Sequence, residues 1–255
     1  VGLDTADKVM KGIMNNCPDD EQAQKLEKQE YVDFLLENEW YGNKSGQGFY
    51  KKLDEKDENG KSVILELDLH ELEYKERESA DLDSMEQSKQ IEDPKKRIKT
   101  LFDMEDKGGE LVRKSLASLF AYASKRVPEV SEQIYPIDDA IRSGFGWDFG
   151  PFEYWDIIGI EKGKEAAEEL GFSVADWVDE MIENGHESFY TKESGKKNYF
   201  NLNSGNYEEV PGSEDLILLE TYEKDNAVYS NDEIVVYDTG DGIMNIQFTS
   251  KQNSI

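Results

Sequence analysis

The chain has 255 residues, and its 57 aspartates and glutamates outnumber its 29 lysines and arginines, which gives a net charge of −28. Such a charge repels nucleic acids and anionic membrane surfaces. The only dense basic run is the short one at Lys95, Lys96 and Arg97, so we predict no nucleic-acid partner. No apolar run reaches the length of a membrane span. The single Cys17 excludes an internal disulfide and is typical of a reducing compartment, so we expect a cytoplasmic protein.

Residues 1–79 are predicted to form two helices and a small β-ribbon. Asp4 or Thr5 can cap the first helix, and the second contains Leu26 together with the apolar run 34–36. The ribbon is expected to pair residues 49–53 with residues 62–67, because Asn59-Gly60 is a strong hairpin signal.

The tip of this ribbon also has the spacing of a calcium-binding loop. Glu55, Asp57, Asn59, Gly60 and Glu66 occupy the positions that would carry ligands and the turn glycine. Calcium loops of this type are flanked by helices, whereas the flanks here have strand character. We therefore favour an acidic hairpin tip and predict no metal site.

Residues 80–108 are predicted to be a linker followed by a helix. Asp93-Pro94 is typical of a helix start, and Gly108-Gly109 is expected to end that helix. The next helix, 110–127, is the clearest amphipathic one. Its apolar positions recur at helical spacing and are Leu111, Val112, Leu116, Leu119, Phe120 and Ala123.

The stretch 137–159 is predicted to form two short helices joined by a glycine-rich elbow. Asp138 and Asp139 favour the start of the first helix, Ser143-Gly144 its end, and Pro151 the first turn of the second. Helices this short are unstable alone, so their apolar patch must pack on a larger body.

Further helices are expected at 161–170 and 173–184, with Ser173 and Asp176 as a capping pair. An acidic loop follows at 208–232. The last segment, 233–255, is expected to contain a β-hairpin that turns at 239–242. His70 and His186 have no metal-ligand partner at helical spacing, and we assign both to surface or packing roles.

An internal repeat links the two ends of this helical region. The octapeptide YVDFLLEN at 31–38 returns as WVDEMIEN at 177–184, so the copies start 146 residues apart (residue 31 against residue 177). A lysine, a Ser-Gly pair and two aromatic residues follow each copy, at 43–52 and at 191–201. We predict two copies of one helical unit, of which the first lacks its front half.

The segments VGLDT (1–5), NKSGQGFYKK (43–52) and IRSGFGWDFGPFEYWDIIG (141–159) resemble the C-terminal helical domains of 3-hydroxyacyl-CoA dehydrogenases. The hairpin segment is similar to the opening of an enoyl-CoA hydratase domain. The resemblance implies a mainly α fold of two tandem domains like the C-terminal domain of 6-phosphogluconate dehydrogenase, each with a β-ribbon. The implied domains are 1–79, the linker and helix 80–108, the second repeat 109–207, the acidic loop 208–232 and the hairpin 233–255.

The resemblance implies that this chain is the helical body of a longer NAD-dependent dehydrogenase of fatty-acid β-oxidation, fused to a hydratase. The implied partners are an acyl-CoA substrate, an upstream nucleotide-binding domain and, as an open option, a second copy in a homodimer. The chain contains no G-x-G-x-x-G loop and no matching catalytic histidine. We therefore expect no catalytic residue here, no cofactor bound by this chain and no activity without the rest of the protein.

The same resemblance suggests residues that contact the acyl chain, CoA or another subunit. The candidates are Lys44, Phe49, Tyr50, Trp147, Phe152 and Trp155. For each aromatic residue, plain core packing is the alternative role. Two other readings of the whole chain also stay open, namely a non-catalytic acyl-CoA- or protein-binding module and a structural scaffold between two enzymes.

Overall fold

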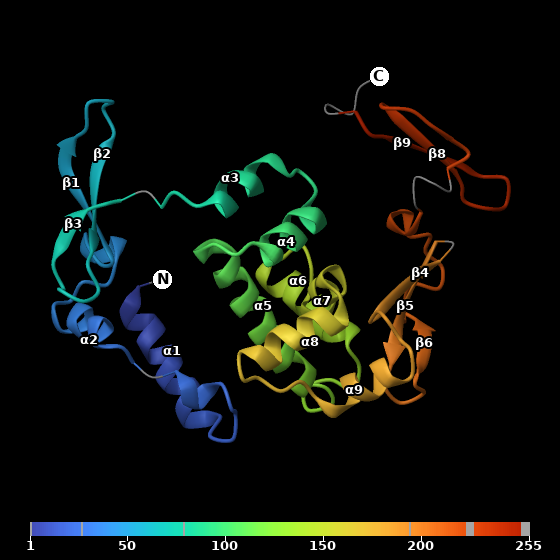
Figure 1. Ribbon diagram of the computed structural model, residues 1–255, viewed down its shortest axis with the longest axis horizontal. Coiled ribbons are helices and arrows are strands. Elements are labelled where there is room, and N and C mark those ends of the chain that lie inside the picture. Colours follow the sequence, from blue (N-terminus) through green and yellow to red (C-terminus); the bar gives the residue numbers. More distant parts are fainter. Residues whose placement is uncertain (1, 27, 79, 194, 223–226, 251–255) are drawn as a thin grey trace. The chain divides into compact units, whose positions relative to one another are not determined.

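The computed structural model describes residues 2–26, 28–78, 80–193, 195–222 and 227–250 (Figure 1). The chain divides into two compact units, Val1–Asp81 and Leu82–Ile255. Within the described residues, nine α-helices accompany three small antiparallel sheets of three strands each. The fold therefore mixes helices with small sheets. Val1, Ser194 and residues 251–255, on which parts of the repeat and hydratase predictions rest, lie outside the described residues.

The helices of the first unit are α1 (Leu3–Asn16) and α2 (Glu30–Glu37), with short 3-10 turns at Ala23–Lys25 and Asn43–Ser45. The cap of α1 differs from the prediction, since Gly2 precedes the helix and makes no side-chain cap. Leu26 also lies outside α2, at the end of the first 3-10 turn. Leu35 is the buried residue of α2.

The sheet of the first unit contains β1 (Tyr50–Lys56), β2 (Ser62–Leu67) and β3 (Tyr74–Glu76) in that order. The predicted ribbon is confirmed, because Tyr50 pairs with Glu66 in an antiparallel register. At its tip the Asp57 carboxylate accepts hydrogen bonds from the backbone N–H groups of Asn59 and Lys61. The tip is thus a hairpin turn flanked by strands.

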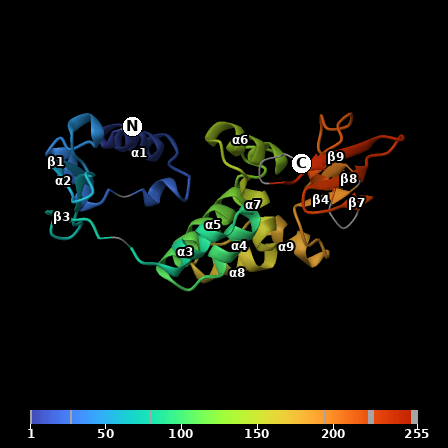
Figure 2. The ribbon, with the colours of Figure 1, turned by 90° about the horizontal axis from the view of Figure 1, so that it is seen from above.

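Seven helices form the body of the second unit. They are α3 (Asp83–Gln90), α4 (Pro94–Asp103), α5 (Lys107–Lys125), α6 (Tyr135–Phe145), α7 (Pro151–Ile158), α8 (Ile160–Glu169) and α9 (Asp176–Glu183). The long helix α5 packs against α4, α7 and α8 (Figure 2). Phe120 of α5 stacks on Trp155 of α7 with ring centroids 5.0 Å apart, and both are fully buried.

The start of α4 agrees with the prediction, and its end does not. The Asp93 carboxylate accepts hydrogen bonds from the first backbone N–H groups of α4. The helix ends at Asp103, however, and Gly108-Gly109 belongs to the first turn of α5. The reason is Asp106, whose side chain accepts from the N–H of Gly109 and so begins a new helix there.

The predicted elbow is confirmed. Gly146 ends α6 with a left-handed backbone (φ 66°), two residues later than expected, and Pro151 occupies the first turn of α7. Gly150 lies directly against the Cα and Cβ of Asp138, so a side chain at this glycine would collide with α6. The elbow therefore folds the two short helices tightly together.

The second sheet follows α9 in the chain and contains β4 (Tyr190–Glu193), β5 (Lys196–Asn201) and β6 (Asn206–Glu209). The predicted capping pair of α9 is wrong. Ala175 precedes the helix, and the Ser173 hydroxyl instead accepts a hydrogen bond from Lys125 Nζ (3.0 Å). A 3-10 turn at Leu219–Thr221 follows within the predicted acidic loop.

The third sheet contains β7 (Tyr229–Ser230), β8 (Ile234–Asp238) and β9 (Met244–Phe248), and so confirms the predicted hairpin. Val235 and Tyr237 face the protein and are buried. The opposite face is apolar and exposed, with Ile246 paired to Val236 and Phe248 paired to Ile234.

Both units contain a short helix followed by a three-stranded antiparallel sheet, namely α2 with β1–β3 and α9 with β4–β6. The assignment of these parts to two copies of one domain stays a prediction. In the part of the chain that the structure describes, no helix has both the length and the apolar character that a membrane crossing requires.

Candidate functional site

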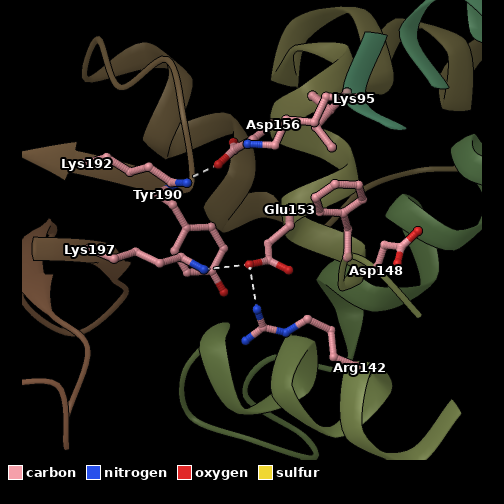
Figure 3. Close-up of a pocket in the computed structure, with 10 residues that line it drawn as sticks. Lys95, Arg142, Asp148, Glu153, Asp156, Tyr190, Lys192 and Lys197 are labelled. Carbon is pink, nitrogen blue, oxygen red and sulfur yellow. Dashed lines mark hydrogen bonds and ion pairs between the residues drawn. The ribbon is translucent and has the colours of Figure 1, made fainter. Parts of the chain in front are cut away.

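A pocket of about 330 Å³ opens in the second unit where five elements meet (Figure 3). Helices α4, α6 and α7 supply one side, and strands β4 and β5 supply the other. The lining residues are Lys95, Arg142, Asp148, Phe149, Glu153, Asp156, Ile157, Tyr190, Lys192 and Lys197. The predicted elbow thus forms part of a cavity wall.

Glu153 of α7 links two basic residues of this pocket. Its Oε1 atom accepts from Lys197 Nζ (2.5 Å) and from Arg142 Nη1 (3.2 Å), and Oε2 accepts from the backbone N–H of Gly150 (2.9 Å). Burial opposes its ionisation, but the ion pairs with Lys197 and Arg142 lower the pKa of Glu153 below its ordinary value. The elbow therefore carries a fixed carboxylate between two cations.

Asp138 of α6 lies beneath the pocket and ties three elements together. Its carboxylate accepts from the backbone N–H of Phe152 (2.9 Å) and of Glu153 (3.2 Å) at the start of α7. The hydroxyl of Tyr190 donates to it from β4 (2.8 Å). Burial raises the pKa of Asp138 to about 7, although the hydrogen bond from Phe152 opposes this shift.

Asp156 makes the complementary connection from α7 to β4. Its two oxygens accept from the backbone N–H groups of Phe189 (2.7 Å) and Tyr190 (2.9 Å). Burial raises the pKa of this carboxyl to about 7 as well. The position of β4, and with it the pocket wall, is therefore set by a carboxylate that titrates near neutral pH.

The predicted contact residues are dispersed over the two units. Phe152 and Trp155 are fully buried in the core of the second unit, so in this structure they pack and reach no open surface. Trp147 is exposed beside the elbow. In the first unit Lys44 forms an ion pair with Asp4, and Tyr50 is exposed. The contact role of Lys44, Phe49, Tyr50 and Trp147 stays a prediction.

Sequence reasoning did not identify the pocket itself. Its cations come from three separate parts of the sequence, which are Lys95, Arg142 and the hairpin pair Lys192 and Lys197. Asp138 is predicted only as an acid at the start of a helix, because no neighbouring residue in the sequence reveals its burial. The usable signal was the Gly-Pro-Phe-Glu elbow, which fixes Glu153 close to α6.

Comparison with known proteins gives a match over the whole chain. A Bacillus subtilis protein named "Probable 3-hydroxyacyl-CoA dehydrogenase" is 34% identical over 256 residues, which cover 100% of this chain and 31% of that protein. The resemblance to 3-hydroxyacyl-CoA dehydrogenases is confirmed. This chain spans about a third of the length of that dehydrogenase relative.

Two rickettsial proteins carry the words "fatty acid oxidation complex trifunctional enzyme" in their names. The Rickettsia felis protein is 25% identical over 48% of this chain and 15% of its own length. The Rickettsia prowazekii protein is 21% identical over 60% of this chain and 19% of its own length. No family model matches this chain, and no solved structure matches it.

Proposed function

We propose that the chain is the helical body of an NAD-dependent 3-hydroxyacyl-CoA dehydrogenase of fatty-acid oxidation, and that it supports the acyl-CoA site without carrying the catalytic residues. The observation that carries this proposal is the 34% identity over 100% of the chain. Because the match includes both compact units and the C-terminal sheet, the whole chain corresponds to one continuous part of the dehydrogenase relative.

The residues of this chain do not fit NAD. Dinucleotides bind at the carboxyl ends of parallel strands, beside a glycine-rich turn. Every strand pairing among the described residues is antiparallel, and the sequence has no G-x-G-x-x-G run. We therefore place the cofactor in another part of the whole protein.

The two histidines also lack the surroundings of an acid–base catalyst. His186 packs against the rings of Phe200 and Tyr207, at centroid distances of 4.8 and 5.3 Å. His70 lies in an exposed turn, where its backbone N–H donates to Asp68. Within the described ranges, no group of three or more His, Cys, Asp or Glu side chains is arranged to hold a metal. The proposed role is therefore structural support and substrate contact.

The proposal includes a tandem arrangement of two related helical units. The shared order of one short helix and a three-stranded antiparallel sheet supports it. The same proposal includes contact between copies of the whole protein and fusion to a hydratase. The two rickettsial proteins are named as trifunctional enzymes, which agrees with such a fusion.

The test compares the natural gene product with this 255-residue chain in the same assays. We expect the gene product to reduce NAD in the presence of a 3-hydroxyacyl-CoA, and the chain alone to give no signal above the buffer control. Enoyl-CoA hydration measured on both samples tests the fused activity. Oxidation by the chain alone, or none by the gene product, would overturn the assignment.

A further inference from the structure

Helix α1 (blue in Figure 1), which lies entirely within the described residues, buries none of its apolar side chains. Val9 is 55% exposed, Ile13 is 41% exposed, and Ala6 is exposed as well. These three residues are three and four positions apart, so they share one side of the helix. The residue that α1 does bury is an acid, Asp7. The apolar side of α1 is therefore open surface in the first unit, and such a patch is typical of an interaction site.

A hollow of about 400 Å³ continues this face of α1. Leu3 and Ala6 of α1 line one side of it. Its other lining residues are Gly2, Trp40, Tyr41, Gly42, Asn43, Gly48, Phe49 and Tyr50. Every residue of this lining is uncharged, and most of its side chains are aromatic or aliphatic. The hollow therefore suits an apolar or aromatic group.

The second unit contains a helix that corresponds to α1. Helices α8 and α9 precede strands β4–β6 in the same order in which α1 and α2 precede β1–β3. A glycine lies immediately before each first helix, Gly2 before α1 and Gly159 before α8. Counting from these glycines matches the two helices residue by residue.

Two matched positions are covered in α8 and open in α1. Ala6 and Val9 lie four and seven residues after their glycine, as do Gly163 and Ala166 in α8. Gly163 and Ala166 are buried, and α8 packs against α5 and α7. Ala6 and Val9 are exposed. The helix that would cover α1 therefore has a model within this chain.

Aromatic rings lie directly on the covered position of α8. A Cβ at Gly163 would collide with the ring of Trp155 from α7 and would touch Phe120 from α5. Ala6, at the matched position of α1, instead lines the hollow. The comparison therefore indicates which group fills the hollow, namely an aromatic side chain carried by a helix.

We propose that α1 receives an amphipathic helix that carries an aromatic side chain, and that another part of the whole protein supplies this helix. Its apolar side lies on Ala6, Val9 and Ile13, and its aromatic side chain enters the hollow beside Trp40. This role rests on the tandem arrangement that is part of the proposed function.

The source of the helix is argued from length and composition. The matched part is only 31% of the dehydrogenase relative, so a protein of that size has ample further chain to supply a helix. A second copy of α1 does not fit, because the sequence of α1, LDTADKVMKGIMNN, contains no aromatic residue to enter the hollow.

The experiment measures how fast a thiol on this face reacts with N-ethylmaleimide, in the whole gene product and in the 255-residue chain. The test variant is Val9→Cys. The matched control is Lys8→Cys, at an exposed position on the polar side of the same helix. Peptide mass spectrometry quantifies labelling at each site separately from the exposed Cys17. Circular dichroism checks that both variants keep the fold.

In the gene product, the thiol of Val9→Cys should react about tenfold or more slowly than that of Lys8→Cys, because a covered site reacts only through local opening. In the 255-residue chain the two rates should agree within about threefold. Similar rates in the gene product would overturn the inference. Slow reaction of Val9→Cys already in the 255-residue chain would also overturn it, because the chain would then cover the face itself.

Hydrogen exchange gives a second measurement that needs no substitution. The backbone amides of α1 should exchange more slowly in the gene product than in the 255-residue chain, whereas those of the hairpin tip at 57–60 should exchange equally in both. Equal exchange of α1 in both samples would contradict a covering helix.

Cross-linking distinguishes the source of the helix. Lysine cross-links are formed in an equal mixture of gene product with light and with heavy nitrogen, and those from Lys8 and Lys11 of α1 are identified. We expect links to a segment outside the 255 residues, within chains of one isotope. Links between light and heavy chains would assign the face to a second copy and overturn the inference. An active gene product with an uncovered α1 would refute it and leave the dehydrogenase assignment intact.

Discussion

Helix α2 with its sheet and helix α9 with its sheet have the same local order but different burial. Tyr50 of β1 is 56% exposed, whereas Phe200 of β5 is 6% exposed. Helix α2 buries Leu35, whereas α9 buries Val178 and Met181. The second unit adds the helical body around α5, against which α9 and its sheet can pack. Similar local sequence thus produces similar elements, but neighbouring elements determine how much apolar surface those elements bury.

The largest expected contrast comes from one tryptophan in each unit. Trp155→Ala should lower the free energy of unfolding of the second unit by about 3–5 kcal/mol. Its ring is fully buried, stacks on Phe120 and donates Nε1–H to the carbonyl of Ile160 (2.9 Å). Trp40→Ala should lower the free energy of unfolding of the first unit by clearly less, because Trp40 is only half-buried. Urea unfolding with hydrogen exchange assigned to each unit measures both, and equal losses would contradict the comparison.

The second unit should also respond to pH in a way the first unit does not. Burial raises the pKa of Asp138 and Asp156 to about 7, from an ordinary value of 3.8. Between these values the folded unit keeps protons that the unfolded chain releases. The free energy of unfolding should therefore fall by a few kcal/mol as pH rises from about 4 to about 7.

The check is urea unfolding of the second unit at several pH values. Asp138→Asn/Asp156→Asn should flatten the dependence, whereas Asp148→Asn, at an exposed carboxyl, should leave the slope unchanged. The lowered pKa of Asp106, caused by hydrogen bonds from Gly109 and Ser84, acts in the opposite direction but only below about pH 4. A slope unaffected by the double substitution would exclude these two acids as its source.

Two helix caps provide a smaller contrast within the second unit. Asp138→Ala should lower the free energy of unfolding by about 2 kcal/mol, because it leaves buried N–H groups of α7 and the Tyr190 hydroxyl without their acceptor. Asp93→Ala at the exposed start of α4 should cost about 1 kcal/mol. Thermal unfolding of the two variants against the wild type ranks them, and a reversed order would show that burial does not determine the strength of these caps.

The smallest contrast concerns the glycines of the two Ser-Gly pairs. Gly46 and Gly195 both have positive φ, 84° and 87°, so alanine strains the backbone at either site by about 1 kcal/mol. Open space surrounds Gly46, whereas a Cβ at Gly195 would lie 3.0 Å from the Tyr222 hydroxyl. Gly195→Ala should therefore lower the free energy of unfolding more than Gly46→Ala in the same denaturation assay. Equal effects would show that the Tyr222 side chain moves aside without an energetic cost.

These contrasts also show which features the sequence could predict. Asn59-Gly60, Asp93-Pro94 and the elbow glycines act through their own backbone neighbours, so the hairpin, the start of α4 and the turn into α7 were predictable. The pocket was not predictable, because Lys95 and Lys197 are distant in the sequence and line one cavity only in the folded unit. The burial of Asp138 was not predictable for the same reason, since the backbone of a different helix donates to its carboxylate.

The close contact of Gly150 with Asp138 has a use beyond this molecule. The elbow needs an acid on one helix, a glycine twelve positions later and a glutamate three positions after that glycine, here Asp138, Gly150 and Glu153. Each position has its own stereochemical reason, so the spacing can serve as a search pattern in translated genomes. Chains found in this way should show the same paired short helices, even where overall identity is too low for alignment.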